Sequence, residues 1–327
     1  MSANPLVSVV IVNWNGAHHL RICLPSLLAQ SYQELEIIVI DNASSDDSAK
    51  VAEEYKVRWL ALKDNSGLAP GLNTGAAAAN GKFLLFVNND MRFDAAFVAE
   101  LVAPLRRDEG IFCTDAMQFS WDGKERGHLA ARLATKPVPG KRTAELVPGL
   151  HFYQQEKIQQ SKVFMASAAC MMARRSIFEK LGGFDGRLPL GYEDVEICWR
   201  AWAYGYSTVY VPTAICWHRV GSSIQSTPAL RFAFRGVLTG RLLLATKLLP
   251  ARYAWRTWMI SAAGLAKDFV LLRWRFVVDR MRILLKMGSL VRSLRSEKRR
   301  IFAEARRSED AQLRMLIELS TEDGGVE

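Results

Sequence analysis

The hydrophobic and polar positions of the first hundred residues alternate between strand-like and helix-like stretches. Residues 7–12 form a β-branched apolar run that stops at a polar loop, which is the pattern of a buried parallel strand. Leu20, Leu24 and Leu27 then recur at helical spacing. The pattern continues with strands predicted over 36–40, 57–62 and 83–87 and helices over 49–55 and 69–79. Such repeated units predict an α/β fold with a mostly parallel sheet flanked by helices.

The second half of the chain is less uniform. Residues 120–162 are rich in glycine and proline, which predicts a loop-rich insertion that shapes a substrate cleft. Regular patterns then return: an ordered stretch over 163–173, helices over 176–181 and 192–204, and strands over 208–211 and 215–217. From residue 229 the pattern is long, helical and basic. We therefore expect an α/β domain over 1–228 and a basic helical region over 229–327 that ends in an acidic tail.

The charge of the chain is concentrated in that second region. The 43 Lys and Arg outnumber the 33 Asp and Glu, for a net charge of +10. Residues 1–228 are balanced, whereas residues 229–307 hold nineteen basic and four acidic side chains. Interleaved apolar and basic residues are typical of helices that lie on an anionic membrane surface. The same pattern also fits a helical bundle that packs on the first domain, or a homo-oligomer contact. Nucleic acid is not expected, because no nucleic-acid-binding motif accompanies the charge.

Composition narrows the protein class. The five cysteines form no CxxC pair, so the sequence favours reduced core thiols over a zinc ribbon or a disulfide framework. The start of the chain lacks the pattern of a signal peptide, and no apolar run reaches the roughly 18 residues of a membrane span. We therefore expect a cytoplasmic protein, associated peripherally with the inner face of the cell membrane through residues 229–307.

Polar residues follow the predicted strands at their carboxyl ends, the edge where open α/β sheets bind ligands. The sequence has neither GxGxxG after the first strand nor a P-loop, so the usual phosphate cradles are excluded. Carboxylates and amides at this edge can bind a nucleobase or ribose hydroxyls and hold a divalent metal on a diphosphate. Each of them alone is equally a common turn residue. The residues in question are Asn13, Asn15, Asp41, Asp64, Asn65, Asn88, Asn89 and Asp90.

Seven segments in order resemble the motifs of inverting family 2 glycosyltransferases, which have the GT-A fold. The first four are VSVVIVNWNG (7–16), VIDNASSDDS (39–48), DNSGLAPGLNTG (64–75) and LLFVNND (84–90). The segments at 166–185, 191–206 and 211–223 are similar to the acceptor-side and catalytic parts of that family. The resemblance covers residues 6–223 and is greatest to the rhamnosyltransferase-like branch of bacterial surface polysaccharide and O-antigen synthesis. It implies that 1–228 is a GT-A catalytic domain.

The resemblance also implies roles for individual residues. Those expected to bind the nucleotide-sugar are Asn13, Asn15, Asp41, Asn65, Gly67, Gly71, Asn73 and Asn89. The two glycines would let the backbone approach the ligand. The metal ligands would be Asp90, Asn88 and His218, binding Mg²⁺ or Mn²⁺. Asn88-Asn89-Asp90 stands where the family has a DxD-type triplet, and this departure leaves one carboxylate for the metal.

Glu193 and Asp194 match the acidic pair of the family. The resemblance implies that Asp194 is the general base that takes the acceptor hydroxyl proton and that Glu193 orients the acceptor. Two acids are also favourable at any helix start, so a purely structural role stays open.

The function that the resemblance implies is a metal-dependent inverting transfer of a sugar, rhamnose or similar. The donor would be a nucleotide-diphospho-sugar, and the acceptor a lipid-linked or growing surface glycan. The reduced metal triplet keeps open a catalytically weak nucleotide-sugar-binding subunit of a polysaccharide assembly complex. A nucleotidyltransferase is disfavoured, because its basic glycine-rich triphosphate loop is absent from the first strand end.

Overall fold

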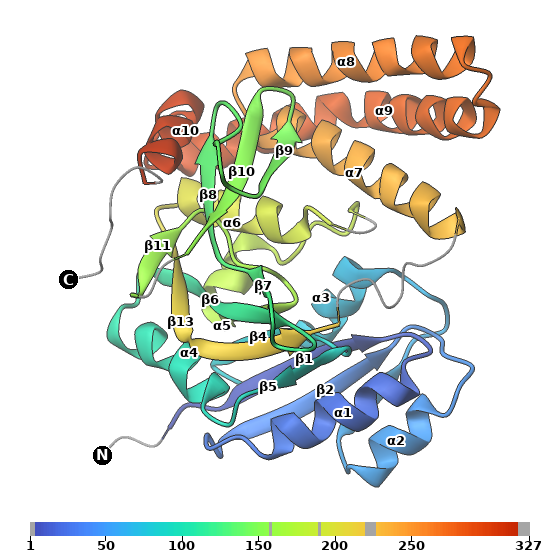
Figure 1. The fold of residues 1–327 in the computed structure, drawn as a ribbon. Helices are drawn as coiled ribbons and strands as arrows, with labels where there is room; N and C mark the ends of the chain where they lie inside the picture. Colours follow the sequence, from blue (N-terminus) through green and yellow to red (C-terminus); the bar gives the residue numbers. More distant parts are fainter. Residues whose placement is uncertain (1–3, 157–158, 189–190, 220–226, 320–327) are drawn as a thin grey trace.

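The computed structural model describes residues 4–156, 159–188, 191–219 and 227–319. Its centre is a ten-stranded sheet in the order β11-β13-β6-β12-β4-β1-β2-β3, with β5 paired to β13 and β7 to β6 (Figure 1). The strands are β1 (Val7–Asn13), β2 (Leu35–Asp41), β3 (Arg58–Ala61), β4 (Phe83–Asn88), β5 (Met91–Phe93), β6 (Ile111–Ser120), β7 (Arg126–His128), β11 (Ser161–Val163), β12 (Cys170–Arg174) and β13 (Ser207–His218).

The predicted alternation of strands and helices is confirmed, and helices cover both faces of the sheet. One face packs against α1 (Ala17–Leu28), α2 (Ser48–Glu54) and α4 (Phe97–Arg107). The other packs against α3 (Leu68–Ala78), α5 (Arg175–Leu181) and α6 (Glu193–Ala203). The inner strands are β-branched and leucine-rich because both of their faces are buried. All five cysteines are buried free thiols, as expected.

The strand register aligns the polar strand ends at one edge. Strands β1, β2, β3 and β4 run parallel, with Asn13 opposite Asp41 and Val12 opposite Asn88. Strand β12 runs antiparallel between β4 and β6, and Cys170 at its start lies opposite Val87. The loop that precedes β12 therefore lies at the same edge as the carboxyl ends of β1, β2 and β4.

Two expectations about secondary structure need correction. The segment 120–162 is not mainly loop: it contains β7 and a separate antiparallel sheet in the order β8-β10-β9, built from β8 (Ala130–Ala134), β10 (Leu150–Gln155) and β9 (Thr143–Val147). Apart from Gly127 in β7, its glycines and prolines lie in the turns between strands. The strands expected over 208–211 and 215–217 are one strand, β13, which pairs with β6 and shifts register between Val211 and Ile215. That irregularity interrupts the apolar pattern without ending the strand.

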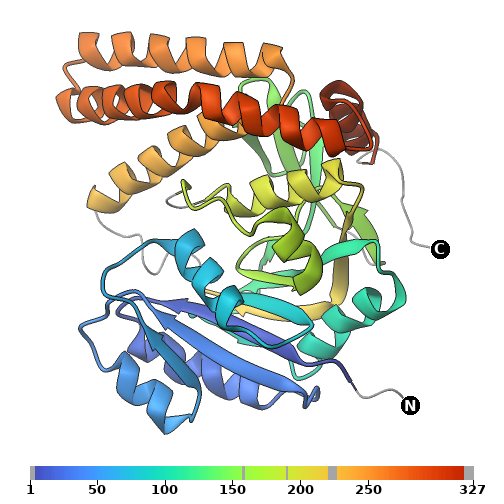
Figure 2. The same ribbon diagram turned by 180° about the vertical axis from the view of Figure 1, so that it is seen from behind.

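The C-terminal region is a helical bundle above α6 and the small sheet (Figures 1 and 2). It consists of α7 (Thr227–Leu248), α8 (Ala251–Val270), α9 (Trp274–Glu304) and α10 (Glu309–Glu318). Leu244, Leu248 and Leu249 join the core that also contains α6. Helix α7 therefore packs on the first domain, which is one of the alternatives to a membrane surface that the sequence left open. None of the described helices combines the length and apolar character that crossing a bilayer requires.

A buried cluster of charges joins this bundle to the rest of the chain. The Lys247 Nζ on α7 lies 2.8 Å from Asp185 Oδ2, 2.7 Å from Glu196 Oε1 and 3.4 Å from Glu297 Oε2. Arg187 bridges Asp185 and Glu297, and Arg200 holds Glu196 at 2.5 Å. Three cations balance three carboxylates, which buried charges require. The cluster fixes α7 and α9 against α6.

A second contact joins α7 to the residue just before the acidic pair. Tyr192 has a left-handed backbone with φ of 72°, and its hydroxyl donates to the carbonyl of Leu146 at 2.7 Å. A Cβ on Gly240 of α7 would lie 2.5 Å from the Tyr192 ring, so only glycine allows this approach. The bundle therefore supports the start of α6 as well as its middle.

Candidate active site

The ends of β1 and β2 form a hydrogen-bonded polar cluster. The Asp41 carboxylate accepts from both the backbone N–H and the hydroxyl of Ser44. The Ser44 hydroxyl in turn accepts from the Asn15 N–H at 2.8 Å and from Asn13 Nδ2 at 3.3 Å. Asn89 Nδ2 donates to Asn13 Oδ1 at 2.7 Å. The structure thus brings together Asn13, Asn15, Asp41 and Asn89, which the sequence predicts to bind the nucleotide-sugar.

The segment before α3 lies beside this cluster. Asn42, which follows Asp41, donates from Nδ2 to the carbonyl of Gly67 at 3.1 Å. Asn65 Oδ1 accepts from the Gly67 N–H at 3.0 Å. Gly67 has φ of 89°, a conformation that glycine adopts without strain, and it precedes the first turn of α3. Asn65 and Gly67 are therefore held close to the end of β2.

Two further predicted nucleotide-sugar residues have structural contacts of their own. A Cβ on Gly71 would lie 3.0 Å from a methyl group of Val12, so this glycine lets α3 pack closely on β1. The Asn73 amide donates to the Phe184 carbonyl and accepts from the Phe184 N–H, both at 2.9 Å. These contacts account for the residue types without a ligand, so a ligand-binding role for Gly71 and Asn73 stays a prediction.

The three predicted metal ligands converge although they come from distant parts of the sequence. Asp90 Oδ1 lies 3.2 Å from His218 Nε2, and Asn88 Nδ2 lies 3.3 Å from the same ring nitrogen. His218 is the last residue of β13, which lies opposite Met91 of β5. One carboxylate, one imidazole and one amide can bind Mg²⁺ or Mn²⁺, and an amide flip would turn the Asn88 oxygen to this centre. Over the described ranges, no group of three or more His, Cys, Asp or Glu side chains could hold a metal. The residues fit an ion that takes its remaining ligands from a bound diphosphate.

Glu193 and Asp194 begin α6 and differ in their surroundings. Glu193 is 4% exposed, and its Oε2 has no hydrogen-bond partner within the described part of the chain. Burial, reinforced by the neighbouring Asp194, raises the pKa of Glu193 to about 8. Asp194 is less buried, and its carboxylate accepts from the N–H groups of Val195 at 2.8 Å and Ala168 at 3.3 Å. Burial also raises the pKa of Asp194, but these N–H donors oppose the shift. At neutral pH, Asp194 is the carboxylate better suited to take a proton.

The loop before β12 connects this acidic pair to the metal residues. The Ala168 N–H donates to Asp194, while the Ala169 carbonyl accepts from the Asn88 N–H at 3.1 Å. Two consecutive residues therefore contact the acidic pair on one side and the Asn88–Asp90 segment on the other. The candidate base and the candidate metal residues consequently belong to one site at the carboxyl edge of the sheet.

Asp115 and His128 belong to the same region, and sequence reasoning missed both. Asp115 is fully buried in β6, where its Oδ2 lies 2.8 Å from His128 Nε2 and its Oδ1 accepts from the Ser167 N–H at 3.1 Å. Burial alone would lower the pKa of His128, but Asp115 and, more weakly, Asp194 outweigh it and raise the pKa. An isolated aspartate within the apolar run 111–119 was a usable signal, because buried carboxylates require partners.

The Asp115–His128 pair gives a prediction about pH. Because the folded-state pKa of His128 is raised above the usual 6.5, the pair stabilises the fold fully below about pH 6.5. This stabilisation is lost as the pH rises through the raised pKa. Asp115→Asn is expected to lower the His128 pKa, measured by NMR titration of the imidazole protons. An unchanged titration in the variant would show that Asp115 does not set the charge of His128.

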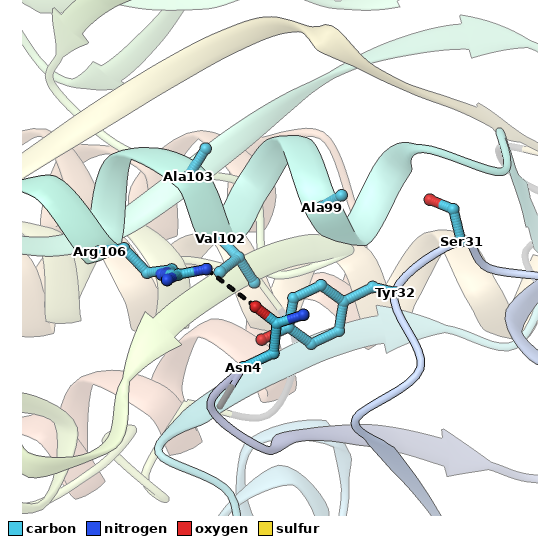
Figure 3. A pocket seen from close by; sticks show the side chains of 7 residues that line it. All are labelled: Asn4, Ser31, Tyr32, Ala99, Val102, Ala103 and Arg106. Carbon is cyan, nitrogen blue, oxygen red and sulfur yellow. Dashed lines mark hydrogen bonds between the residues drawn. The ribbon is translucent and has the colours of Figure 1, made fainter. Parts of the chain in front are cut away.

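A surface cavity of about 270 Å³ lies at the opposite edge of the sheet (Figure 3). Its lining comes from the segment before β1, the loop after α1 and one face of α4, and Arg106 there donates to the Asn4 side chain at 2.9 Å. Asn4 precedes the start of β1, whereas the candidate site follows its end, roughly 20 Å away along a seven-residue strand. The cavity therefore does not belong to the candidate active site.

Comparison with known proteins identifies the class of this fold and site. Residues 8–182 match Glycosyl transferase family 2, and residues 149–289 match Glycosyl transferase family group 2. The chain belongs to glycosyl transferase family 2. The second match continues from the α/β domain through α7 and α8 into α9, so the helical bundle shares in the family resemblance.

Similar proteins include one that is named for an activity and others that are named as uncharacterized. The N-acetylglucosaminyl-diphospho-decaprenol L-rhamnosyltransferase of Mycobacterium tuberculosis is 26% identical over 249 residues, which is 70% of this chain and 80% of that protein. The uncharacterized protein y4gI of Sinorhizobium fredii is 28% identical over 248 residues, 72% of this chain. This chain spans only 27% of y4gI and 28% of an uncharacterized glycosyltransferase of Rickettsia prowazekii.

The fold is shared with solved structures at low sequence identity. The crystal structure of GalNAc-T7 with UDP, GalNAc and Mn²⁺ has a TM-score of 0.58 at 22% identity. The match covers 76% of this chain and 51% of that one. The expected GT-A fold is confirmed.

Proposed function

We propose that this chain is an inverting glycosyltransferase that transfers a sugar from a nucleotide-diphospho-sugar to a saccharide acceptor. One observation carries the proposal: the loop 167–169 holds Asp194 and the Asn88–Asp90 segment in one site. Inversion needs a carboxylate on the acceptor side, which takes the hydroxyl proton as that oxygen attacks the anomeric carbon. Asp194, with a carboxylate oriented by two backbone N–H groups, is proposed as this base. Glu193, mostly protonated at neutral pH, would donate a hydrogen bond that orients the acceptor.

The donor would bind at the ends of β1 and β2. The Asp41 carboxylate can accept hydrogen bonds from a nucleobase or a ribose, and Asn13, Asn15 and Asn89 supply further polar groups. Asp90, His218 and Asn88 would hold Mg²⁺ or Mn²⁺, and a divalent ion supplies charge stabilisation for a departing nucleoside diphosphate. The first domain is balanced in charge, so its residues would bind the donor through individual polar contacts rather than bulk charge.

The proposed sugar is rhamnose or a similar deoxysugar, and the proposed acceptor is a lipid-linked or growing surface glycan. The likeness to a mycobacterial enzyme named for a diphospho-decaprenol acceptor and L-rhamnose supports both. A lipid-linked acceptor resides in a membrane, so we also propose a peripheral position on the cytoplasmic face of the cell membrane. The basic character of residues 229–307 supports that position.

A screen of nucleotide-sugars tests the donor proposal. A ligand at a concentration 100 times its dissociation constant stabilises the fold by about 2.7 kcal/mol, which is readily measured as a shift in Tm. We expect one dTDP-, UDP- or GDP-sugar to raise Tm in the presence of Mn²⁺ or Mg²⁺, and Asp41→Ala to remove the shift. If no nucleotide-sugar changes Tm, the donor proposal is wrong.

The metal proposal gives a separate prediction. Asp90→Ala removes the one carboxylate among the three proposed ligands, so transfer is expected to fall by at least about a hundredfold and to need more metal. Asp108→Ala, at an exposed position before the start of β6 and at the opposite edge of the sheet, is a matched control and should leave transfer unchanged. Transfer that resists both EDTA and Asp90→Ala would refute the metal role.

A further inference from the structure

The C-terminal helices have one face packed on the rest of the chain and one face left outside. Leu242, Leu243 and Leu244 of α7 are fully buried, and Lys247 lies in the ionic cluster described above. These residues cannot contact a membrane, although the sequence pattern does not distinguish them from the exposed apolar and basic residues of 229–307. In Figures 1 and 2, α8 forms the outer side of the bundle, and the turn that joins it to α9 lies at one end. The exposed surface belongs to α8, this turn and the first part of α9, here named the α8–α9 hairpin (Ala251–Arg292).

Large apolar side chains are exposed along the hairpin and are densest at its turn. The five around the turn are between 49% and 77% exposed: Phe269, Val270, Leu271, Leu272 and Trp274. Others continue along the outer faces of the two helices: Trp255, Met259, Ile260, Met281 and Leu285. An isolated exposed leucine is ordinary, but a contiguous apolar patch marks an interaction surface.

The backbone at the turn strengthens this interpretation. Leu272 has a left-handed conformation with φ of 54°, which costs a leucine free energy and costs a glycine almost none. Glycine is the usual residue at this point after a helix. Leu272 is 69% exposed, so packing within the chain does not offset the cost. A partner that buries the leucine side chain would offset it.

The charges of the hairpin identify the chemistry of that partner. Its sequence contains nine Lys and Arg but only two acids, Asp268 and Asp279. Both acids are buried and paired, with Arg280 at 2.9 Å and Arg231 at 2.8 Å. Seven basic side chains are exposed and make no ion pair within the described residues: Arg256, Lys267, Arg273, Arg275, Arg282, Lys286 and Arg292. The outer surface is therefore apolar at the turn and positively charged around it.

We propose that the α8–α9 hairpin is the surface that docks on an anionic lipid bilayer. The apolar side chains of the turn would enter the boundary between headgroups and acyl chains, and the exposed cations would contact anionic headgroups. A second copy of this chain is a poorer occupant, because a symmetric contact would bring two positive surfaces together. This inference rests on the proposed function for its cellular setting, but its test does not require transfer.

The test measures binding of the full chain to vesicles. Vesicles of phosphatidylglycerol and phosphatidylcholine are compared with vesicles of phosphatidylcholine alone, by co-sedimentation. The charge variant Arg273→Gln with Arg275→Gln should lower the partition coefficient for anionic vesicles roughly thirtyfold, about fivefold for each cation. The apolar variant Leu271→Ser with Leu272→Gly should lower it about tenfold or more, and glycine suits the left-handed backbone. The controls Arg107→Gln and Leu28→Ser remove the same side-chain types from exposed positions on α4 and α1 and should bind like the wild type.

A second readout reports the depth of docking. Tryptophan fluorescence should shift to shorter wavelength on anionic vesicles and be quenched by brominated acyl chains, and Trp274→Phe should remove most of the quenching. The proposal is overturned if the wild type ignores anionic vesicles or if both hairpin variants bind like the controls. It is also overturned if the wild type dimerises and the hairpin variants abolish the dimer, because the occupant is then a second copy. Vesicle binding without any donor binding or transfer would leave this proposal standing and refute the proposed function.

Discussion

Asp194→Asn is expected to lower the rate of sugar transfer by a factor of about 10² to 10⁴, the usual contribution of a positioned general base. Asparagine keeps the shape of the side chain, and its single oxygen can still accept from the Val195 N–H, so α6 should begin as before. The longer 3.3 Å bond from the Ala168 N–H is lost, because that N–H donates to the other carboxylate oxygen. Binding of the nucleotide-sugar should be unchanged, because the contacts proposed for the donor lie at the ends of β1 and β2. The measurement is the initial rate of transfer, with donor affinity from the shift in Tm. Wild-type transfer by this variant would refute the role of Asp194.

Glu193→Gln is the matched control for Asp194→Asn, because it changes the neighbouring carboxyl in the same way. The folded-state pKa of Glu193 is about 8, against about 4.3 for an unfolded chain, so the folded protein binds the extra proton between these values. The wild type therefore loses stability as the pH rises from about 4.3 to about 8. The glutamine variant lacks this loss and should be relatively more stable at pH 9 than at pH 5. Its transfer rate should fall less than that of Asp194→Asn, since glutamine can still donate to the acceptor.

The second large effect is expected at Lys247. Replacing it with methionine leaves Asp185, Glu196 and Glu297 without their shared cation in a buried site. Removing one partner of a buried ionic cluster typically costs about 3 to 5 kcal/mol, because the remaining charges stay desolvated. The free energy of unfolding, measured with urea, should fall by about this amount. Lys267→Met, at an exposed position of α8, is the control and should change stability by less than about 0.5 kcal/mol.

The stabilisation that this cluster gives at low pH depends on the protonation of Asp185. Burial alone would raise the pKa of Asp185, but Arg187 and Lys247 outweigh it and hold the pKa well below its usual range. A depressed carboxyl pKa stabilises the fold above the unfolded-state value of about 3.9 and loses this effect as the pH falls further. The stability advantage of the wild type over Lys247→Met should therefore be largest near neutral pH and should shrink as the pH falls below about 3.9. Equal stability of the two proteins would mean that the helical bundle does not depend on the cluster.

Much of the fold follows from the sequence because buried strands and amphipathic helices have different periods. The runs at 7–12, 36–40 and 83–87 are β1, β2 and β4 in the structure, with boundaries that differ by at most one residue. The small sheet over 130–155 was not predicted, because its strands are short, β9 and β10 are only partly buried, and glycine and proline turns separate them. A local sequence pattern reveals a strand that is buried on both faces. It does not reveal which short strands pair with one another when they are distant in the sequence.

The candidate site was predictable where residues follow consecutive strands, and less so where distant segments meet. Asn13, Asp41 and Asn88 are at aligned strand ends, so the parallel sheet alone brings them together. The contact of Asp115 with His128 depends on the pairing of β6 with β7, which no local pattern encodes. Asn73 and Gly71 match a motif, yet their contacts are with Phe184 and Val12. A motif position can serve packing as well as a ligand.

The C-terminal region shows a limit of composition as a guide. Its interleaved apolar and basic residues indicated one membrane surface over 229–307, but α7 buries its leucines and Lys247 against α6. The sequence pattern of α7 is like that of the α8–α9 hairpin, and only the contacts in the structure show that these residues of α7 are buried and those of the hairpin exposed. Cutting the chain near residue 228 would expose the core beneath α7, so point variants of the full chain are the sounder test of membrane binding.

The central claim is that one site binds a nucleotide-sugar and transfers its sugar with Asp194 as the base. The most direct measurement is release of nucleoside diphosphate by the full chain, with the donor found by the Tm screen, Mn²⁺ or Mg²⁺, and a lipid-linked saccharide fraction. Release should depend on the acceptor fraction, and the Asp194→Asn variant should release nucleoside diphosphate at least about a hundredfold more slowly while it still binds the donor. Donor binding without acceptor-dependent release, or equal release by the wild type and Asp194→Asn, would contradict the claim. The former result would instead indicate a nucleotide-sugar-binding subunit.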